Sequence, residues 1–206
     1  MVKTERLSPQ GRIVQAAERI FLRSGFSRVS MDDLARELGM SKKTLYAHFP
    51  GKEALVLAML EHRTADIDVA LKAIVDSPQP FAEKFRELAQ LLQVHAGEVS
   101  PAFLEDIRRF SPAGFQVIER FRARAIPLYF GQLIDEGIRE GCLGGTVPRQ
   151  LLMRMVVLSI QGIVRPDVVA ELKIHPAVAL DHILTIIFSG ILTAKGRRAQ
   201  KQLTSS

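Results

Sequence analysis

Residues 30–51 contain two helix starts close together, and this pattern limits the fold more than any other stretch of the chain. Ser30 is a favourable N-cap, and Asp33 three residues later makes a shortened capping box. Ser41 is a second N-cap, and Gly39 between them suits the positive φ of a tight chain reversal. The sequence therefore predicts a helix-turn-helix over residues 30–51.

The second of these helices has one apolar and one polar face. Leu45 and Phe49, four residues apart, are expected to face the core. The polar side chains then face outward together: Lys42, Lys43, Thr44, Tyr46 and His48. A helix that reads DNA needs such a face, because its first turn meets base edges while flanking groups meet phosphates. An ordinary helix pair with a solvated lysine face is the alternative.

The helices before and after this pair also have clear starts. Ser8 and Pro9 suit an N-cap and a first helical position, and Gly25 suits the end of that helix. Lys52 lies at the start of the next helix, where the helix dipole disfavours a cation. A phosphate bound at that N-terminus would offset the cost. A lysine that points into water is the alternative.

The net charge of +6 is unevenly distributed. Residues 1–52 hold ten Lys and Arg against five Asp and Glu, whereas residues 53–190 hold fourteen against seventeen. The last sixteen residues hold four basic residues and no acidic one. A basic front on a mildly acidic body indicates one end that meets a polyanion, although a generic basic surface has the same composition.

Helical periodicity continues through the rest of the chain, and strong period-two alternation is absent, so the fold class is predicted to be all-α. The expected helices lie at 52–76, 80–96, 101–110, 113–140, 148–165 and 176–195. Pro127 is expected to kink the long helix that contains it.

Residues 9–56 resemble the DNA-binding domain of the TetR family of transcriptional repressors. The likeness is carried by AAERIFLRSGF and by SMDDLARELGMSKKTLYAHFPGKEAL. It implies an N-terminal three-helix DNA-binding domain with a helix-turn-helix over residues 1–52. A C-terminal helical bundle for ligand binding and dimerisation is then expected over 53–195, with a polar, flexible tail over 196–206. The family's DNA contacts map onto Ser30, Lys42, Lys43, Thr44, Tyr46, His48 and Lys52. Gly51 departs from the family, which often has a polar helix cap there.

The last two expected helices are apolar on more than one face, and such helices need cover on more than one face. In the resembling family, these helices pair with their copies as a four-helix dimer interface, whereas a monomer core is the alternative. The expected interface residues are Leu152, Met155, Val156, Ile183, Leu184, Ile187 and Ile191.

The middle helices hold most of the aromatic residues, and an apolar pocket with few polar groups suits a hydrophobic ligand. The candidate ligand residues are Phe103, Ile107, Phe110, Phe121 and Tyr129. Each of them alone also suits a hydrophobic core, so a packed core is the alternative.

The motifs of common enzymes are missing from the sequence. The five histidines have no metal-ligand spacing, and no P-loop, Ser-His-Asp arrangement or dinucleotide-binding turn occurs. We therefore expect no catalytic residue, metal or cofactor. The single cysteine, Cys142, excludes an internal disulfide and fits a reducing cytoplasm. The apolar stretch at 183–192 is too short to span a bilayer, so we expect a cytoplasmic protein without membrane contact.

These patterns together predict a sequence-specific DNA-binding transcriptional regulator. The expected protein is a homodimeric repressor that a small apolar or amphipathic effector releases from a near-palindromic operator in double-stranded DNA. The alternative is a helical small-molecule-binding protein whose DNA-binding domain is vestigial.

Overall fold

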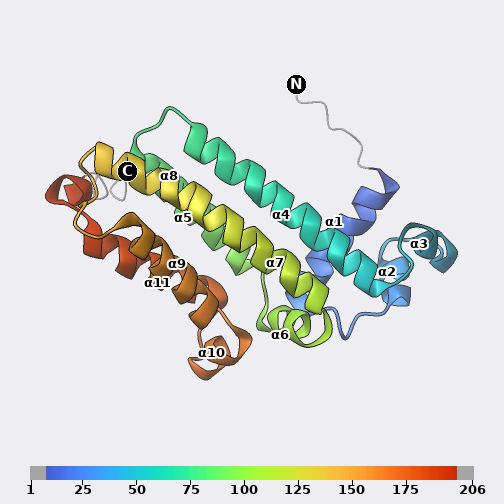
Figure 1. The fold of residues 1–206 in the computed structure, drawn as a ribbon. Helices are drawn as coiled ribbons and strands as arrows, with labels where there is room; N and C mark the ends of the chain where they lie inside the picture. The colour runs from blue at the N-terminus through green and yellow to red at the C-terminus, as the bar shows by residue number, and fades with distance from the viewer. Residues whose placement is uncertain (1–7, 199–206) are drawn as a thin grey trace. The chain divides into compact units, whose positions relative to one another are not determined.

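The computed structural model describes residues 8–198, and these residues fold into helices (Figure 1). In chain order the helices are α1 (Pro9–Ser24), α2 (Met31–Glu37), α3 (Lys42–His48), α4 (Lys52–Asp76), α5 (Phe81–Gly97), α6 (Pro101–Phe110), α7 (Pro112–Ala125), the π-helical η1 (Ile126–Phe130), α8 (Gly131–Arg139), α9 (Arg149–Ile163), α10 (Pro166–Glu171) and α11 (Pro176–Ile191). Within residues 8–198 the sole β-type pairing is an isolated bridge between Leu143 and Leu192. The predicted all-α fold class is therefore confirmed. No helix of this part of the chain has the length and apolarity that a membrane span requires.

The described chain divides into two compact units, each made from two stretches of sequence. The first unit holds the residues up to Ala65 and Val99–Ile118, and the second holds Asp66–Glu98 and the residues from Glu119 onward. This grouping differs from a boundary at residues 52 and 53, because α6 returns to pack against α1. The assignment of DNA binding to residues 1–52, and of ligand binding and dimerisation to 53–195, stays a prediction.

The first unit has its own hydrophobic core beneath α1, α2 and α3. Phe21, Leu34 and Leu45, one from each of these helices, are fully buried. The ring of Phe26 meets Phe103 of α6 edge-on, with 6.2 Å between ring centroids. Burial of a side chain of this size contributes about 1.5–3 kcal/mol. Contacts of this kind hold the short helices α2 and α3, which are too short to be stable alone.

Serine caps fix the helix starts of the first unit. Ser8 Oγ accepts a hydrogen bond from the Gly11 amide at 3.1 Å, and Pro9 occupies the first turn of α1. Gly25 ends α1 with a φ of 77°, which a residue with a side chain rarely adopts. The predicted start and end of this helix are confirmed.

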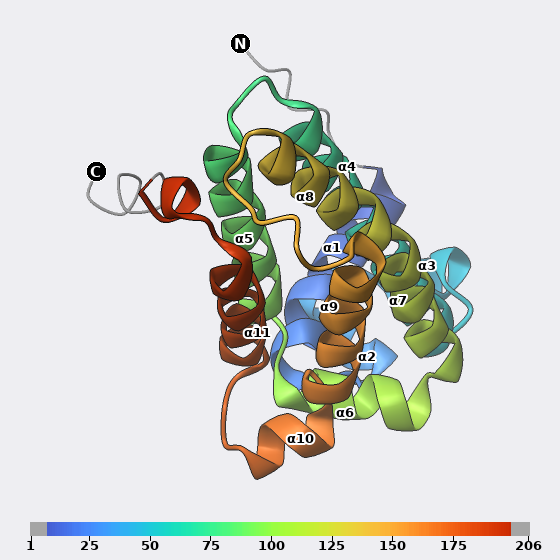
Figure 2. The same ribbon diagram turned by 60° about the vertical axis from the view of Figure 1, so that its left-hand side comes forward.

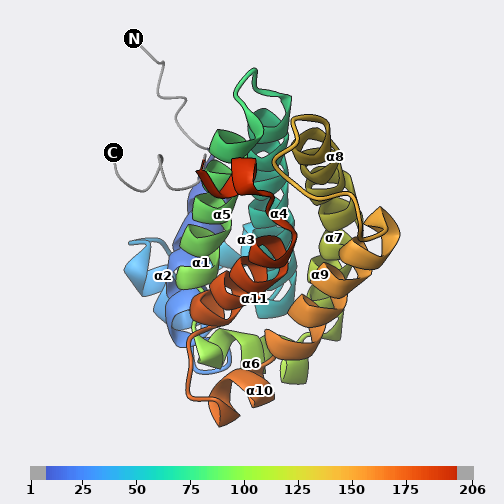
Figure 3. The same cartoon turned by 90° about the vertical axis from the view of Figure 1, so that its left-hand side faces the viewer.

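The second unit packs α11 against α5 and α9, as Figures 2 and 3 show from two directions. The ring of Phe188 in α11 lies 4.4 Å from that of Phe85 in α5 and 6.2 Å from that of Phe130 in η1, measured between centroids. Phe81 stacks on Phe85 at 5.8 Å. Aromatic rings from α5, η1 and α11 therefore meet in the core of this unit, among aliphatic side chains.

The long helix expected at 113–140 is observed as the continuous run α7, η1 and α8. Pro127 lies in the π-helical part, Ile126–Phe130. Proline has no N–H, and in an α-helix its ring collides with the carbonyl four residues earlier. A wider turn relieves this collision. The structure shows one widened turn at Pro127, and the predicted kink stays a prediction.

The last helix ends at Ile191, four residues before the end expected at 195. The chain after it pairs with the segment that follows α8. The Gly144 amide donates to the Ile191 carbonyl at 2.7 Å, and the Thr193 amide donates to the Cys142 carbonyl at 3.0 Å. The predicted helix end was wrong because these tertiary hydrogen bonds replace the helical ones.

Part of the expected tail is attached to the second unit. The Gly196 amide donates to Thr193 Oγ1 at 3.1 Å, and Arg197 Nη1 donates to the Leu192 carbonyl at 2.6 Å. The rest of the tail, residues 199–206, lies outside the described residues, so its predicted flexibility stays a prediction.

Candidate nucleic-acid interface

The turn between α2 and α3 has the geometry that the sequence predicts. The Asp33 amide donates to Ser30 Oγ at 3.1 Å, and the Ser30 amide donates to Asp33 Oδ2 at 3.0 Å. Gly39 has a φ of 61°, and the Met40 amide donates back to the Ala35 carbonyl at 3.0 Å. The predicted helix-turn-helix is therefore confirmed over α2 and α3.

The Ser30 hydroxyl and amide both donate to Asp33, which lowers the pKa of that carboxyl. A carboxyl with a lowered pKa in the folded state stabilises that state above its usual pKa, and the effect is lost as the pH falls through the lowered value. The cap of α2 is therefore complete at neutral pH.

The apolar and polar faces of α3 are separated as predicted. Leu45 and Phe49 are buried in the core of the first unit. The side chains exposed on the other face include those of Lys42, Lys43, Thr44 and Tyr46, and His48 is half-buried. Contact of these residues with DNA stays a prediction, but the helix presents them to solvent from a fixed base.

The two lysines of this face differ in their surroundings. Lys42 Nζ forms an exposed ion pair with Asp32 on α2. Among the described residues, the structure gives Lys43 no ion-pair partner. An exposed ion pair is worth at most about 1 kcal/mol, so DNA phosphate can replace Asp32 at little cost. Lys43 meets a ligand without having to break an existing pair.

The hydroxyls of this region are already engaged in capping. Ser30 Oγ accepts from the Asp33 amide and donates to Asp33 Oδ2 at 2.6 Å. Thr44 Oγ1 lies 2.8 Å from Ser41 Oγ. A hydroxyl has one proton to donate, and phosphate oxygens only accept. The amide and the hydroxyl of Ser30 both donate to Asp33. A hydrogen bond from Ser30 to a phosphate therefore requires the capping box to rearrange.

Lys52 begins α4 as predicted, and its side chain folds back on the loop before α2. Its Nζ donates to the Val29 carbonyl at 3.0 Å and to the Ser27 carbonyl at 3.3 Å. An ammonium group has three N–H donors. Two of them are used here, so one is left for the predicted phosphate contact.

The salt dependence of binding separates these two uses of Lys52. If its third N–H meets a phosphate, Lys52→Ala should flatten the plot of log affinity against log salt by about one unit per protomer. Affinity should fall alike for all DNA sequences, because a phosphate contact carries no sequence information. Filter binding at several salt concentrations measures both quantities. An unchanged slope would exclude a phosphate contact by Lys52.

The five candidate ligand residues are divided between the two units. Phe103 and Ile107 are buried in the core of the first unit, whereas Phe121 and Tyr129 belong to the second. Phe110 is exposed, and the Arg109 guanidinium carbon lies 5.3 Å from its ring centroid. The chain passes from the first unit to the second between Phe110 and Phe121, so a ligand site made of these five residues stays a prediction.

Tyr129 has a polar partner that the sequence did not indicate. Its hydroxyl donates to Asp68 Oδ1 at 2.8 Å, and Arg124 pairs with the same carboxylate at 2.9 Å. Burial raises the pKa of the Tyr129 hydroxyl, and the hydrogen bond to Asp68 adds to this rise. The hydroxyl is therefore a proton donor throughout the neutral range, anchored to α4.

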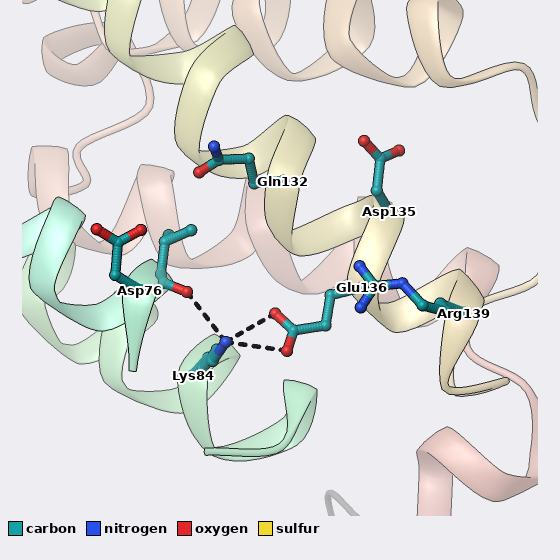
Figure 4. A pocket seen from close by; sticks show the side chains of 7 residues that line it. Asp76, Lys84, Gln132, Asp135, Glu136 and Arg139 are labelled. Atoms are coloured by element: carbon teal, nitrogen blue, oxygen red, sulfur yellow. Dashed lines mark hydrogen bonds and ion pairs between the residues drawn. The ribbon is translucent and has the colours of Figure 1, made fainter. Parts of the chain in front are cut away.

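A polar pocket of about 370 Å³ opens in the second unit (Figure 4). It is lined by Val75, Asp76, Lys84, Gln132, Asp135, Glu136 and Arg139. Lys84 Nζ donates to both Glu136 carboxylate oxygens at 2.9 Å and to the Val75 carbonyl at 3.0 Å. The ammonium group has no donor left for a ligand. This pocket does not match the apolar pocket that the sequence predicts.

The sequence did contain a signal for the buried lysine. Lys84 lies at helical spacing among Phe81, Phe85 and Leu88, on the apolar stripe of α5. A cation in such a stripe needs a buried acceptor, and Glu136 supplies it. A search for charges inside apolar stripes would have found the residue, but not its partner.

The candidate dimer residues are mostly internal. Leu152, Val156, Ile183 and Leu184 are buried in the core of the second unit, whereas Ile187 and Ile191 are half-buried. Met155 alone among the seven is exposed. These buried side chains belong to the faces of α9 and α11 that pack within the second unit, where α11 contacts α5 and α9 contacts η1. They therefore have no exposed surface for a partner subunit.

Other apolar side chains of the same helices remain exposed. On α9 these are Leu151, Met155 and Leu158, which lie at spacings of three and four residues and so share one face. On α11 the exposed residues include Val178 and Ile186, with Ile186 72% exposed. Met155 belongs both to this exposed set and to the predicted interface, whereas Leu151 and Ile186 each lie one position from a predicted residue. An interface through these helices stays a prediction.

Comparison with known proteins places the chain among bacterial regulators. Residues 13–59 match the model of the family "Bacterial regulatory proteins, tetR family". The HTH-type transcriptional regulator EthR of Mycobacterium tuberculosis is 35% identical over 66 residues, 32% of this chain and 31% of EthR. The uncharacterised HTH-type regulator YvaF of Bacillus subtilis is 24% identical over 181 residues, 87% of this chain and 94% of YvaF.

Solved structures extend the likeness to the whole fold. A transcriptional regulator from Cytophaga hutchinsonii aligns with a TM-score of 0.68 at 19% identity, covering 88% of this chain and 97% of the other. The regulator KstR2 of Mycobacterium tuberculosis aligns with a TM-score of 0.59 at 21% identity, covering 94% and 100%. The matched residues contain the α2–α3 pair described above, and together these comparisons support a helix-turn-helix transcriptional regulator of the TetR family.

Proposed function

We propose that the protein is a homodimeric repressor that binds a near-palindromic operator through α3 and leaves it when a small effector binds. The observation that carries the DNA-binding part is the exposed polar face of α3 above the buried Leu45 and Phe49. A helix fixed in this way can enter a major groove as a rigid body, with its N-terminal residues at the base edges.

Lys43 is the residue of this face best suited to read a base. It lies in the first turn of α3 and is exposed, whereas its neighbour Lys42 pairs with Asp32. Guanine presents two acceptors, N7 and O6, in the major groove, and lysine is a common partner for them. Tyr46 lies one turn further along the helix and suits a phosphate or sugar contact.

A binding-site selection from a random pool of duplex DNA tests this assignment. Wild type should recover a near-palindromic motif, and Lys43→Ala should recover one with at least one changed or relaxed position in each half-site. Loss of one good base contact costs about 1–3 kcal/mol of discrimination. Tyr46→Phe is the control and should keep the motif while lowering affinity. Identical motifs for wild type and Lys43→Ala would refute base reading by Lys43.

The dimer part of the proposal rests on the exposed apolar face of α9 and α11. A monomer in water gains nothing from leaving Leu158 and Ile186 exposed on two packed helices. The same face on a second copy would cover them. An isologous dimer presents two recognition helices related by a two-fold axis, which is the reason to expect a near-palindromic operator.

The effector part rests on the aromatic centre of the second unit. Phe81, Phe85, Phe130 and Phe188 supply the apolar surface that a hydrophobic or amphipathic ligand requires. A ligand releases DNA only by binding the DNA-free state more tightly. Linkage then requires that the effector bind more weakly when the operator is present, which titration calorimetry with and without operator measures.

The competing function is a small-molecule-binding protein with a vestigial DNA-binding domain. A duplex of random sequence separates the two functions cheaply. A working domain should bind it weakly, with an affinity that falls steeply as salt rises. A vestigial domain should show neither the binding nor the salt slope.

A further inference from the structure

The loop from Gly25 to Ser30, which leads into the helix-turn-helix, is held by side chains from two other helices. Asp106 of α6 accepts the Ser27 amide at its Oδ2, with 2.7 Å between the atoms. Lys52 of α4 donates to the carbonyl of the same residue at 3.3 Å. Both polar backbone groups of Ser27 therefore meet a charged side chain, and hydrogen bonds to charged groups are the stronger kind.

The contact between α6 and this loop is close along its length. A Cβ atom on Gly25 would lie 2.5 Å from Asp106 Oδ2 and 3.4 Å from the Ala102 backbone. Position 25 requires glycine for two reasons: a Cβ atom would collide with Asp106, and the φ of this residue is positive. Beside the carboxylate, the rings of Phe26 and Phe103 meet edge-on. Asp106 is 6% exposed, and its hydrogen bond to the exposed residue Ser27 is partly buried.

We propose that Asp106 is a positioning residue for DNA binding. By accepting the Ser27 amide it fixes the path of the loop into the capping box of Ser30, and so the position of α2 and α3. The inference rests on the proposed function only in that α3 must be the DNA-reading element. Asp106 itself is buried and touches no DNA.

Removing the negative charge of Asp106 and removing its hydrogen bond to Ser27 should change the DNA affinity in opposite directions. A carboxylate near a polyanion repels it, so a variant that merely removes this charge should bind DNA more tightly. If Asp106 positions the loop, Asp106→Ala should bind a specific duplex more weakly in spite of the lost repulsion. Asparagine keeps an oxygen that can accept the Ser27 amide. Asp106→Asn should therefore retain binding.

The experiment compares full-length wild type with Asp106→Ala, Asp106→Asn and Glu105→Ala. Glu105 is the neighbouring residue on α6 and is exposed, so its removal changes the charge by the same amount without touching the loop. Two DNA probes are used: a duplex that wild type recovers from a random pool, and a duplex of random sequence. Binding is measured by fluorescence anisotropy at one salt concentration.

Asp106→Ala should lose about tenfold in affinity for the recovered duplex, because the loop that leads into α2 and α3 loses its hydrogen bond to a charged side chain. Its affinity for the random duplex, which depends on charge rather than on position, should change by less than about threefold. Asp106→Asn and Glu105→Ala should bind both probes at least as well as wild type. Equal binding of the recovered duplex by wild type and Asp106→Ala would overturn the inference.

Amide hydrogen exchange shows whether the effect passes through the loop. In Asp106→Ala the Ser27 amide should exchange at least about tenfold faster, while the Met40 amide, which donates to Ala35 inside the turn, should stay protected. If Asp106→Ala fails to fold, the Asp106→Asn variant is measured in its place. The inference is overturned if Asp106→Asn loses affinity for the recovered duplex while its Ser27 amide is still protected from exchange. Failure of wild type itself to bind any duplex would instead refute the proposed function.

Discussion

Replacing Ile186 with aspartate should convert the proposed dimer into a monomer. Ile186 is 72% exposed in the single chain, so the substitution leaves the core of the second unit intact. In a dimer through α9 and α11, the aspartate of each subunit would be buried at the interface without an ion-pair partner, because the two-fold axis repeats the contact. An uncompensated buried charge costs about 3–5 kcal/mol, and about 4 kcal/mol weakens association about a thousandfold.

Light scattering after gel filtration measures the mass of each variant. Val69→Asp is a matched control, because Val69 is 70% exposed and lies on α4. That variant should remain a dimer. If Ile186→Asp is a folded dimer of unchanged dissociation constant, the interface lies on another surface.

DNA binding should fall together with dimerisation. A monomer engages one half-site, whereas a dimer gains the second half-site without a further loss of translational freedom. Ile186→Asp should therefore bind the recovered duplex far more weakly than wild type, and its binding should regain strength only at protein concentrations that restore the dimer.

Glu136→Ala should destabilise the second unit by about 3–5 kcal/mol. Lys84 is 5% exposed, and Glu136 supplies two of its three acceptors. Removing the carboxylate leaves a buried ammonium group with the Val75 carbonyl alone. Chemical denaturation followed by circular dichroism measures the change, as a lower midpoint at unchanged slope.

The exposed pair of Lys72 and Asp76 provides the control. Lys72→Ala removes an ion pair of the same chemistry from the surface and should leave the stability nearly unchanged. The double variant Lys84→Met with Glu136→Leu should recover much of the stability, because an apolar pair of similar volume needs no compensation for lost hydration. Equal effects of Glu136→Ala and Lys72→Ala would show that the buried pair is solvated in solution.

The helix-turn-helix was predictable because its signals are local. Ser30, Asp33, Gly39 and Ser41 each specify a cap or a turn through atoms within a few residues, and the structure has the same caps and turn. Local signals also placed the start of α4 at Lys52. The sequence analysis expected no helix between 165 and 176, where the structure has α10, although Pro166 suits the first turn of a helix.

The candidate sites outside this region were harder to predict, because they depend on tertiary packing. Ile183 and Ile186 have the same side chain on the same helix, yet one is buried and the other exposed. When a helix is apolar on several faces, its sequence does not show which face will pack against the rest of the same chain and which will stay exposed. In the same way, nothing local shows that Phe103 and Phe121 belong to different units, or that Asp106 meets an amide far along the chain.

The widened turn at Ile126–Phe130 has a consequence for chain length. Four buried or half-buried residues of the second unit follow one another at intervals of four: Phe121, Ala125, Tyr129 and Leu133. In an α-helix such a row drifts round the axis by about 40° at each step, because four residues exceed one turn. A π-helical turn holds one more residue and pulls the row back. Deleting one residue there would turn everything after it by about 100° and carry Leu133 away from its neighbours. The number of residues in this segment thus specifies the fold as firmly as their chemical nature.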